Sequence, residues 1–168
     1  AYVDIEQLYK NKEGLLVLSG GNNSILKYSN GNSITSQSAS FVADFKKEFI
    51  DNFYIEIQRI EGNDYRIDEE VILNLAYDNN IPVVATNDVY FEGPDHFEAH
   101  DALMCIEKKL FVSQKDRKRL SKNHYFKSQN EMQELFSDIP EALFNTIEIA
   151  QRCSHRPKIK MPVLPSFH

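Results

Sequence analysis

Short apolar runs alternate with amphipathic helical segments in the first half of the chain, and this alternation constrains its fold most strongly. Runs with the length of buried strands are Leu15–Ser19, Phe53–Gln58 and Pro82–Thr86. Helical patterns lie between them at Ser38–Phe49 and Glu69–Asn79. This order is typical of an α/β fold with a parallel sheet or barrel. Because three strands make a small sheet with exposed edges, we expect part of a larger α/β unit, a fragment without either natural end.

The other predicted elements are mostly helical. Ser128 and Glu131 have capping-box spacing, which marks the start of a helix. Leu110–Phe126 lacks a regular pattern, and Arg156–His168, which holds three prolines, reads as an extended linker. The predicted helices are Asp4–Lys10, Asp95–Glu107, Ser128–Phe136 and Pro140–Cys153.

The charge of the chain limits its partners. Its 168 residues include 19 Lys and Arg against 25 Asp and Glu, so the formal net charge is −6. A chain this acidic is not expected to bind nucleic acid over its whole surface. One local exception is the basic group Lys115, Arg117, Lys118 and Arg119, which is either a set of phosphate contacts or a solvated loop. No apolar run approaches the roughly 18 residues that span a bilayer, so we expect no membrane partner.

Cys105 and Cys153 are the two cysteines of the chain, and both lie in apolar helical stretches. There is no CxxC pair, so no zinc site built on cysteine is expected. We interpret both as buried thiols in a reducing compartment, which favours a cytoplasmic location.

Candidate chemical groups lie near the ends of the predicted strands, where α/β folds gather their functional residues. Asp88 follows the third strand and could ligate a metal, act as an acid or base, or cap a turn. Glu56 shares one face of the second strand with Tyr54 and Gln58. That face could line a cleft or barrel interior, face solvent, or place Glu56 in an ion pair with Arg59.

Two histidines, His96 and His100, are spaced so that one helix face could present both to a metal. No third ligand is evident, and the acidic neighbours Asp95, Glu98 and Asp101 indicate a solvated or salt-bridged face instead. The sequence has no glycine-rich phosphate loop, no GxSxG nucleophile elbow and no carboxylate group typical of a polymerase centre.

Several separate blocks of sequence carry a family resemblance in a specific order and spacing. They are Phe53–Arg59, Ile81–Phe91, Phe97–Leu103, His124–Ser128, Leu135–Leu143, Asn145–Cys153 and Leu164–Phe167. Together they resemble the polymerase-and-histidinol-phosphatase (PHP) domain of the alpha subunits of bacterial DNA polymerase III, the replicative C-family polymerases. The amino-acid sequences of these blocks are similar to those of alphaproteobacterial members.

The resemblance implies a partial βα barrel, the C-terminal part of a seven-stranded PHP barrel, followed by helices and a linker. It assigns residues 1–110 to the barrel, 111–155 to a helical extension and 156–168 to an extended linker toward the polymerase palm. The parent chain would be a DNA-directed DNA polymerase that uses Mg²⁺, with its catalytic aspartates beyond this segment. The fragment itself is therefore expected to be non-catalytic and to contain no cofactor.

The resemblance also implies that a metal site is degenerate here. Metal-competent members place ligands at positions that correspond to Ile60, Asp88 and Tyr90. Isoleucine cannot ligate and neutral tyrosine is a poor ligand, so only Asp88 is competent and no bound metal is expected. The implied role is structural support and docking, with the rest of the alpha chain and the proofreading exonuclease subunit as partners and DNA reached through the parent chain. The alternative is a metal-dependent phosphoesterase or proofreading exonuclease.

Overall fold

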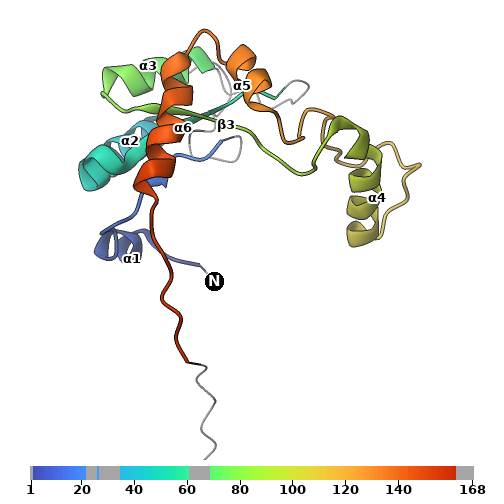
Figure 1. Cartoon of the computed structure of the whole chain (residues 1–168), viewed down its shortest axis with the longest axis horizontal. Coiled ribbons are helices and arrows are strands. Elements are labelled where there is room, and N and C mark those ends of the chain that lie inside the picture. The colour runs from blue at the N-terminus through green and yellow to red at the C-terminus, as the bar shows by residue number, and fades with distance from the viewer. Residues whose placement is uncertain (1, 22–25, 27–34, 61–68, 162–168) are drawn as a thin grey trace, which may run out of the picture.

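A computed structural model describes residues 2–21, 26, 35–60 and 69–161 of the chain (Figure 1). The predicted helices and strands are confirmed, with ends that differ by at most two residues. Residues 162–168 of the predicted linker Arg156–His168 lie outside the described residues. The elements are α1 (Ile5–Lys10), β1 (Val17–Leu18), α2 (Ser36–Phe49), η1 (Ile50–Asn52), β2 (Phe53–Gln58), α3 (Glu69–Asp78), β3 (Val83–Thr86), η2 (Pro94–His96), α4 (Phe97–Lys108), α5 (Gln129–Leu135) and α6 (Pro140–Arg152).

The strands form a parallel sheet in the order β1-β2-β3, as the strand–helix alternation predicts. Ile55 pairs with Val83 and Gln58 with Thr86, so the carboxyl ends of β2 and β3 lie side by side. β1 is shorter than predicted because Leu15 is 39% exposed and lies outside the ladder. The mixed α/β class is therefore confirmed for the described residues, whereas closure into part of a barrel stays a prediction.

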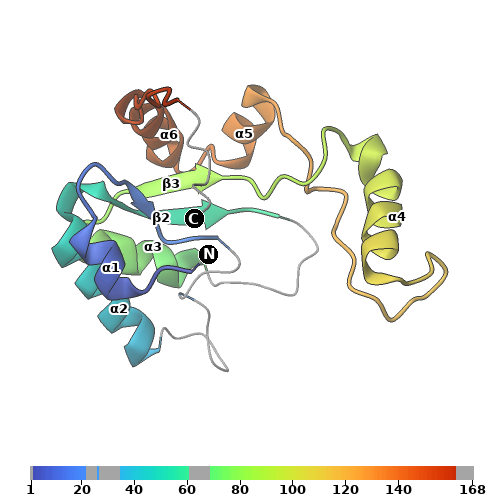
Figure 2. The ribbon, with the colours of Figure 1, turned by 90° about the horizontal axis from the view of Figure 1, so that it is seen from below.

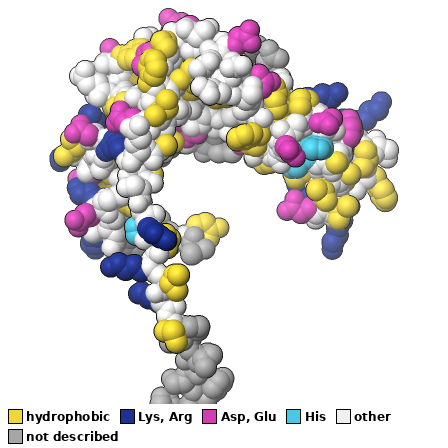
Figure 3. Space-filling model, in the orientation of Figure 1, with side chains coloured by type: hydrophobic (Ala, Val, Ile, Leu, Met, Phe, Trp, Pro, Cys, Tyr) yellow, Lys and Arg dark blue, Asp and Glu magenta, His cyan; other side chains and the backbone are white. Residues whose placement is uncertain are grey.

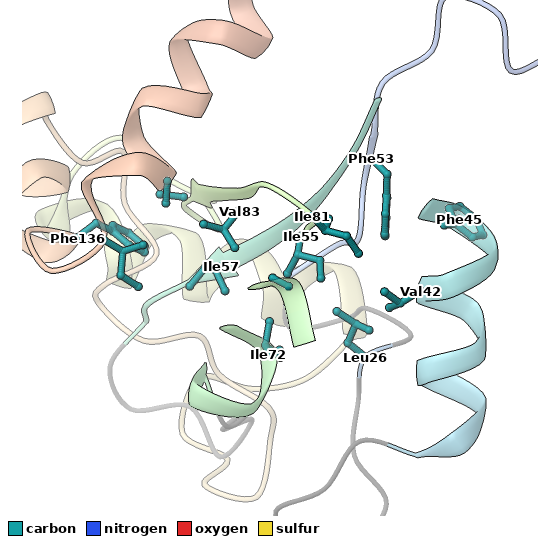
Figure 4. Close-up of a cluster of buried hydrophobic side chains, with 14 of the residues drawn as sticks. Leu26, Val42, Phe45, Phe53, Ile55, Ile57, Ile72, Ile81, Val83 and Phe136 are labelled. Carbon is teal, nitrogen blue, oxygen red and sulfur yellow. The ribbon is translucent and has the colours of Figure 1, made fainter. Parts of the chain in front are cut away.

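One face of the sheet holds the main hydrophobic core, which Figure 4 shows in close-up. Alternate residues of β2, Phe53, Ile55 and Ile57, point into it and are at most 3% exposed. The helix α2 contributes Phe45 and Phe49 at helical spacing, with their rings stacked at 5.5 Å. Burying each of these side chains contributes about 1.5–3 kcal/mol, so this face sets the register of the sheet.

The helices α5 and α6 lie on the other side of the molecule from α1, α2 and α3, and α6 packs against the edge strand β3 (Figure 2). Asn145 Nδ2 on α6 donates a 2.7 Å hydrogen bond to the carbonyl of Val83. The predicted capping box of Ser128 and Glu131 is confirmed at the start of α5. Phe136, in the turn between these helices, is fully buried in the same core as the strands, so residues on both sides of position 110 share one core.

Residues 87–128, called the arm below, leave the end of β3, form α4 and return to α5. In Figure 1 the arm projects to one side of the sheet, and its base is formed by its two ends, which join β3 and α5. At that base Phe91 forms a parallel bridge with Tyr125, and the Phe126 amide donates to the Phe91 carbonyl at 3.0 Å.

Cys105 is buried in α4 as predicted, but Cys153 is exposed because it lies just beyond the end of α6, so the prediction of two buried thiols was half wrong.

Candidate functional site

A network of polar side chains crosses the carboxyl ends of the three strands. Glu56 Oε1 accepts hydrogen bonds from Gln58 Nε2 at 3.1 Å and from the Thr86 hydroxyl. Gln58 Nε2 also lies 3.0 Å from Thr86 Oγ1, and Ser19 Oγ accepts from the Glu56 amide at 3.0 Å. All four side chains are partly buried. Glu56 therefore lies in a polar cluster at the strand ends, while a cleft or barrel interior at this face stays a prediction.

Gly21 brings the segment after β1 against this cluster. A Cβ atom on Gly21 would lie 1.9 Å from Gln58 Oε1, well inside van der Waals contact. Any side chain here would displace the Gln58 amide and break its bonds to Glu56 and Thr86. Glycine therefore allows the backbone to approach the Gln58 amide without moving this flexible side chain.

Arg59 does not pair with Glu56, so that alternative was wrong. Its guanidinium instead contacts Glu69 at the start of α3 and Asp138 before α6, at 2.5 and 2.6 Å. It also donates to the Leu135 carbonyl and lies over the Phe136 ring, 4.8 Å from the centroid. The hydrogen bonds from Arg59 hold the pKa of Asp138 below its usual value. Arg59 thus ties α3, α5 and α6 together, which is a structural role.

The base of the arm gathers a second polar group around Asp88. Asn87 Nδ2 donates to the Tyr125 carbonyl at 2.6 Å, and Lys127 donates to Asn87 Oδ1 at 3.2 Å. The Tyr90 amide donates to the His124 carbonyl at 2.9 Å. These bonds hold the loop after β3 against the returning chain and fix where Asp88 and Tyr90 lie.

Asp88 lies beside a buried histidine that the sequence analysis did not single out. Its Oδ2 atom is 3.9 Å from Nε2 of His124. His124 is 1% exposed. The other ring nitrogen of His124 lies 3.0 Å from the Ser121 hydroxyl. One carboxylate and one imidazole can orient each other or move a proton, but they make an incomplete metal site.

Tyr90 contacts two histidine rings, while Ile60 lies half-buried just beyond β2. The Tyr90 ring centroid is 5.8 Å from that of His100 and 5.7 Å from that of His124, both edge-on. Among the residues that the structure describes, no group of three or more His, Cys, Asp or Glu side chains could hold a metal ion. His96 is exposed in η2 while His100 packs on the rings of Tyr90 and Phe91.

The residues of the basic group on the arm differ in burial and in their ion-pair partners. Arg117 is buried with its side chain 4% exposed, and its guanidinium forms a two-pronged ion pair with Asp101, also 4% exposed. Arg119 reaches the same carboxylate at 3.1 Å and Glu98 at 3.7 Å. The hydrogen bonds from Arg117 lower the pKa of Asp101. The Arg117 guanidinium is therefore held by Asp101. Phosphate contact stays a prediction for the four residues of the basic group, Lys115, Arg117, Lys118 and Arg119.

The spacing of residues in α4 gives a sequence-based indication of the Asp101–Arg117 ion pair. Phe97, Asp101 and Cys105 are the buried residues of this helix and follow one another at four-residue spacing. A carboxylate on a buried stripe needs a charged or hydrogen-bonding partner, because an unpaired buried charge is costly. The spacing thus indicates a buried cation nearby, although it does not say which one.

Comparisons with known proteins identify the family. No family model matches the chain. DNA polymerase III subunit alpha of Caulobacter vibrioides is 41% identical over 158 residues, 94% of this chain. The same subunit of Rickettsia bellii is 35% identical over 166 residues, and that of Pasteurella multocida 38% over 169 residues, each covering 99% of this chain. The chain belongs to the DNA polymerase III alpha subunit family.

The chain spans 14% of the length of each of these relatives. The resemblance that the sequence blocks carry is confirmed at the level of this family, including the alphaproteobacterial relatives. In the part of the chain that the structure describes, no helix has the length and apolar character needed to cross a membrane.

Proposed function

We propose that this chain is a structural and docking segment of a replicative DNA polymerase alpha subunit, with no catalytic activity of its own. It would correspond to the C-terminal half of a PHP barrel and support DNA-templated DNA synthesis, which a Mg²⁺-dependent centre elsewhere in the subunit performs. The rest of the alpha chain and the proofreading exonuclease subunit are its proposed partners, in the cytoplasm. Membership of the alpha subunit family supports this proposal.

The observation that carries the proposal is the state of the three ligand positions. Asp88 retains a carboxylate, but Ile60 and Tyr90 offer no ligand to a transition metal. Asp88 lies near His124, and the Tyr90 ring stands between His100 and His124. Aromatic and imidazole contacts at Tyr90 therefore pack the base of the arm.

Exposed apolar surface supports the docking role. A groove of about 680 Å³ between α5 and α6 is lined by Met132, Leu143 and Phe144, among others. Phe144 and Ile147 are 68% and 57% exposed on this side of α6. Figure 3 shows further hydrophobic side chains gathered on the arm. Contiguous apolar surface of this kind is typical of an interface, and most of the relatives' length lies outside this segment.

The proposal is tested by hydrolysis of single-stranded DNA by the complete alpha subunit with Mg²⁺, Mn²⁺ or Zn²⁺. We expect no release of nucleotides above the blank, and the same result for Asp88→Ala, because one carboxylate and one histidine cannot assemble the centre. DNA synthesis by the same preparations shows that the subunit is folded. Hydrolysis by the native subunit that Asp88→Ala abolishes would overturn the proposal and favour the phosphoesterase or exonuclease alternative.

A further inference from the structure

A small pocket lies between α4 and the loop that follows it, on the arm. Its volume is about 130 Å³. Pockets that hold drug-sized ligands are typically about 300–1,000 Å³, so this one is too small for a nucleotide but has room for a single small ion or group. The buried side of the pocket is apolar and includes Phe97, Met104 and Leu120.

The rim of the pocket concentrates positive charge. Lys108 at the end of α4 and Lys118 and Arg119 from the loop all line it. The acidic residue in the lining, Asp101, already accepts hydrogen bonds from Arg117 and lies 3.1 Å from Arg119. A chain with a formal net charge of −6 thus places three cations around one small hollow. Glu98 also lies 3.7 Å from Arg119, so three cations face two carboxylates at the rim. The excess positive charge makes an anion the favoured occupant.

Neutral hydrogen-bond donors complete the lining on the side toward the body. Tyr90 and His100 both border the pocket, with their rings in edge-on contact at 5.8 Å. Within the described residues, neither the Tyr90 hydroxyl nor the His100 ring has a hydrogen-bond partner. A hydroxyl, an imidazole, an arginine and two lysines together match the several oxygen acceptors of a phosphate group.

We propose that this pocket binds one phosphate group, either from a polynucleotide backbone or as free phosphate. Lys108, Lys118 and Arg119 supply the charge, while Tyr90 and His100 supply the neutral donors. The site goes beyond the proposed docking role, although it shares Tyr90 with the degenerate ligand positions. It also narrows the basic group to the members that line the pocket, because Arg117 is committed to Asp101.

The test uses the complete alpha subunit and a double variant, Lys108→Gln with Lys118→Gln. The matched control is Lys115→Gln with Lys122→Gln, which removes two exposed lysines of the same loop that do not line the pocket. Hydrogen exchange of residues 97–122 is measured with inorganic phosphate and with chloride at equal ionic strength. We expect phosphate to slow exchange in the native subunit and the control, but not in the double variant.

Binding of primer–template DNA, measured by fluorescence anisotropy over a range of salt, separates the two sources of phosphate. A plot of log affinity against log salt has a negative slope. If the DNA backbone occupies the pocket, the double variant makes this slope less steep by about 1, and the control changes it far less. If the double variant has the native slope, while inorganic phosphate protects the native subunit but not the double variant, the pocket is assigned to free phosphate and the proposal is still supported. Absence of phosphate protection in the native subunit, together with equal DNA slopes for all three proteins, would overturn it.

Discussion

Replacing Asp101 with asparagine is expected to open the arm. Asp101 and Arg117 are each 4% exposed, and the variant leaves the Arg117 guanidinium without its carboxylate. Nε of Arg117 already lacks a hydrogen-bond partner within the described residues, so the remaining bonds to Asp101 matter more. Breaking a pair in this way costs more than the pair contributes, because a charge stays buried and unpaired.

Limited trypsin digestion of the complete subunit measures the opening, because the loop carries cleavage sites at Lys115, Arg117 and Lys118. The arm is one helix and one loop thick, so solvent screens part of the cost, and we expect cleavage roughly ten- to a hundredfold faster in Asp101→Asn. The control is Glu98→Gln, which removes a 71% exposed partner of Arg119 at 3.7 Å and should change the rate little. Equal rates for Asp101→Asn and the native subunit would contradict the structural role of the pair.

The same pair predicts a pH dependence. The hydrogen bonds from Arg117 depress the folded-state pKa of Asp101 below that of the unfolded chain. Its contribution to stability is therefore fully present above the ordinary carboxyl pKa and lost as the pH falls through the lower, folded-state value. Hydrogen exchange of α4, corrected for intrinsic rates, should accelerate in this acid range in the native subunit and lack this component in Asp101→Asn.

Replacing Phe136 with alanine is expected to loosen the packing between the sheet and α6. Phe136 is 0% exposed, belongs to the core that includes Ile57, and lies under the Arg59 guanidinium. Removing a fully buried phenylalanine side chain costs about 3–5 kcal/mol, through lost burial and the cavity that remains. We expect the amides of β2 and β3 to exchange about a hundred- to a few thousandfold faster, as measured by hydrogen exchange with mass spectrometry on the complete subunit.

Phe126→Ala is the matched control for this experiment. Phe126 is 70% exposed at the base of the arm, so its loss should change stability by about 0.5 kcal/mol or less. Equal exchange rates in the two variants would show that Phe136 does not anchor the core. Slower exchange in Phe136→Ala than in the native subunit would contradict the packing described for this residue.

The strands and helices could be predicted from sequence because their patterns are local. The alternation of Phe53, Ile55 and Ile57 in β2 and the four-residue spacing of Phe45 and Phe49 in α2 each carry a single period. The capping box at Ser128 is likewise a short-range signal. By contrast, the projection of the arm from the sheet depends on contacts such as Phe91 with Tyr125, which are 34 residues apart, and no local pattern encodes them.

The candidate site was only partly predictable for the same reason. Asp88 follows directly from its place after β3, and its partial exposure suits a strand-end loop. His124 could not be paired with it from sequence, because the return of the chain through residues 109–123 has no regular pattern. The pairing of Arg117 with Asp101 was also missed, because a row of cations is typical of a solvated surface and only the buried positions of α4 indicate that Asp101 needs a cation.

The metal content of the complete alpha subunit distinguishes a structural segment from a metal-dependent hydrolase. Elemental analysis after mild purification is compared between the native subunit and the variant that carries both Ile60→His and Tyr90→His, which restores the two lost ligand types. We expect substoichiometric zinc, manganese and iron in the native subunit, with any gain in metal content confined to the variant. Stoichiometric metal in the native subunit that is lost in Asp88→Ala would contradict it.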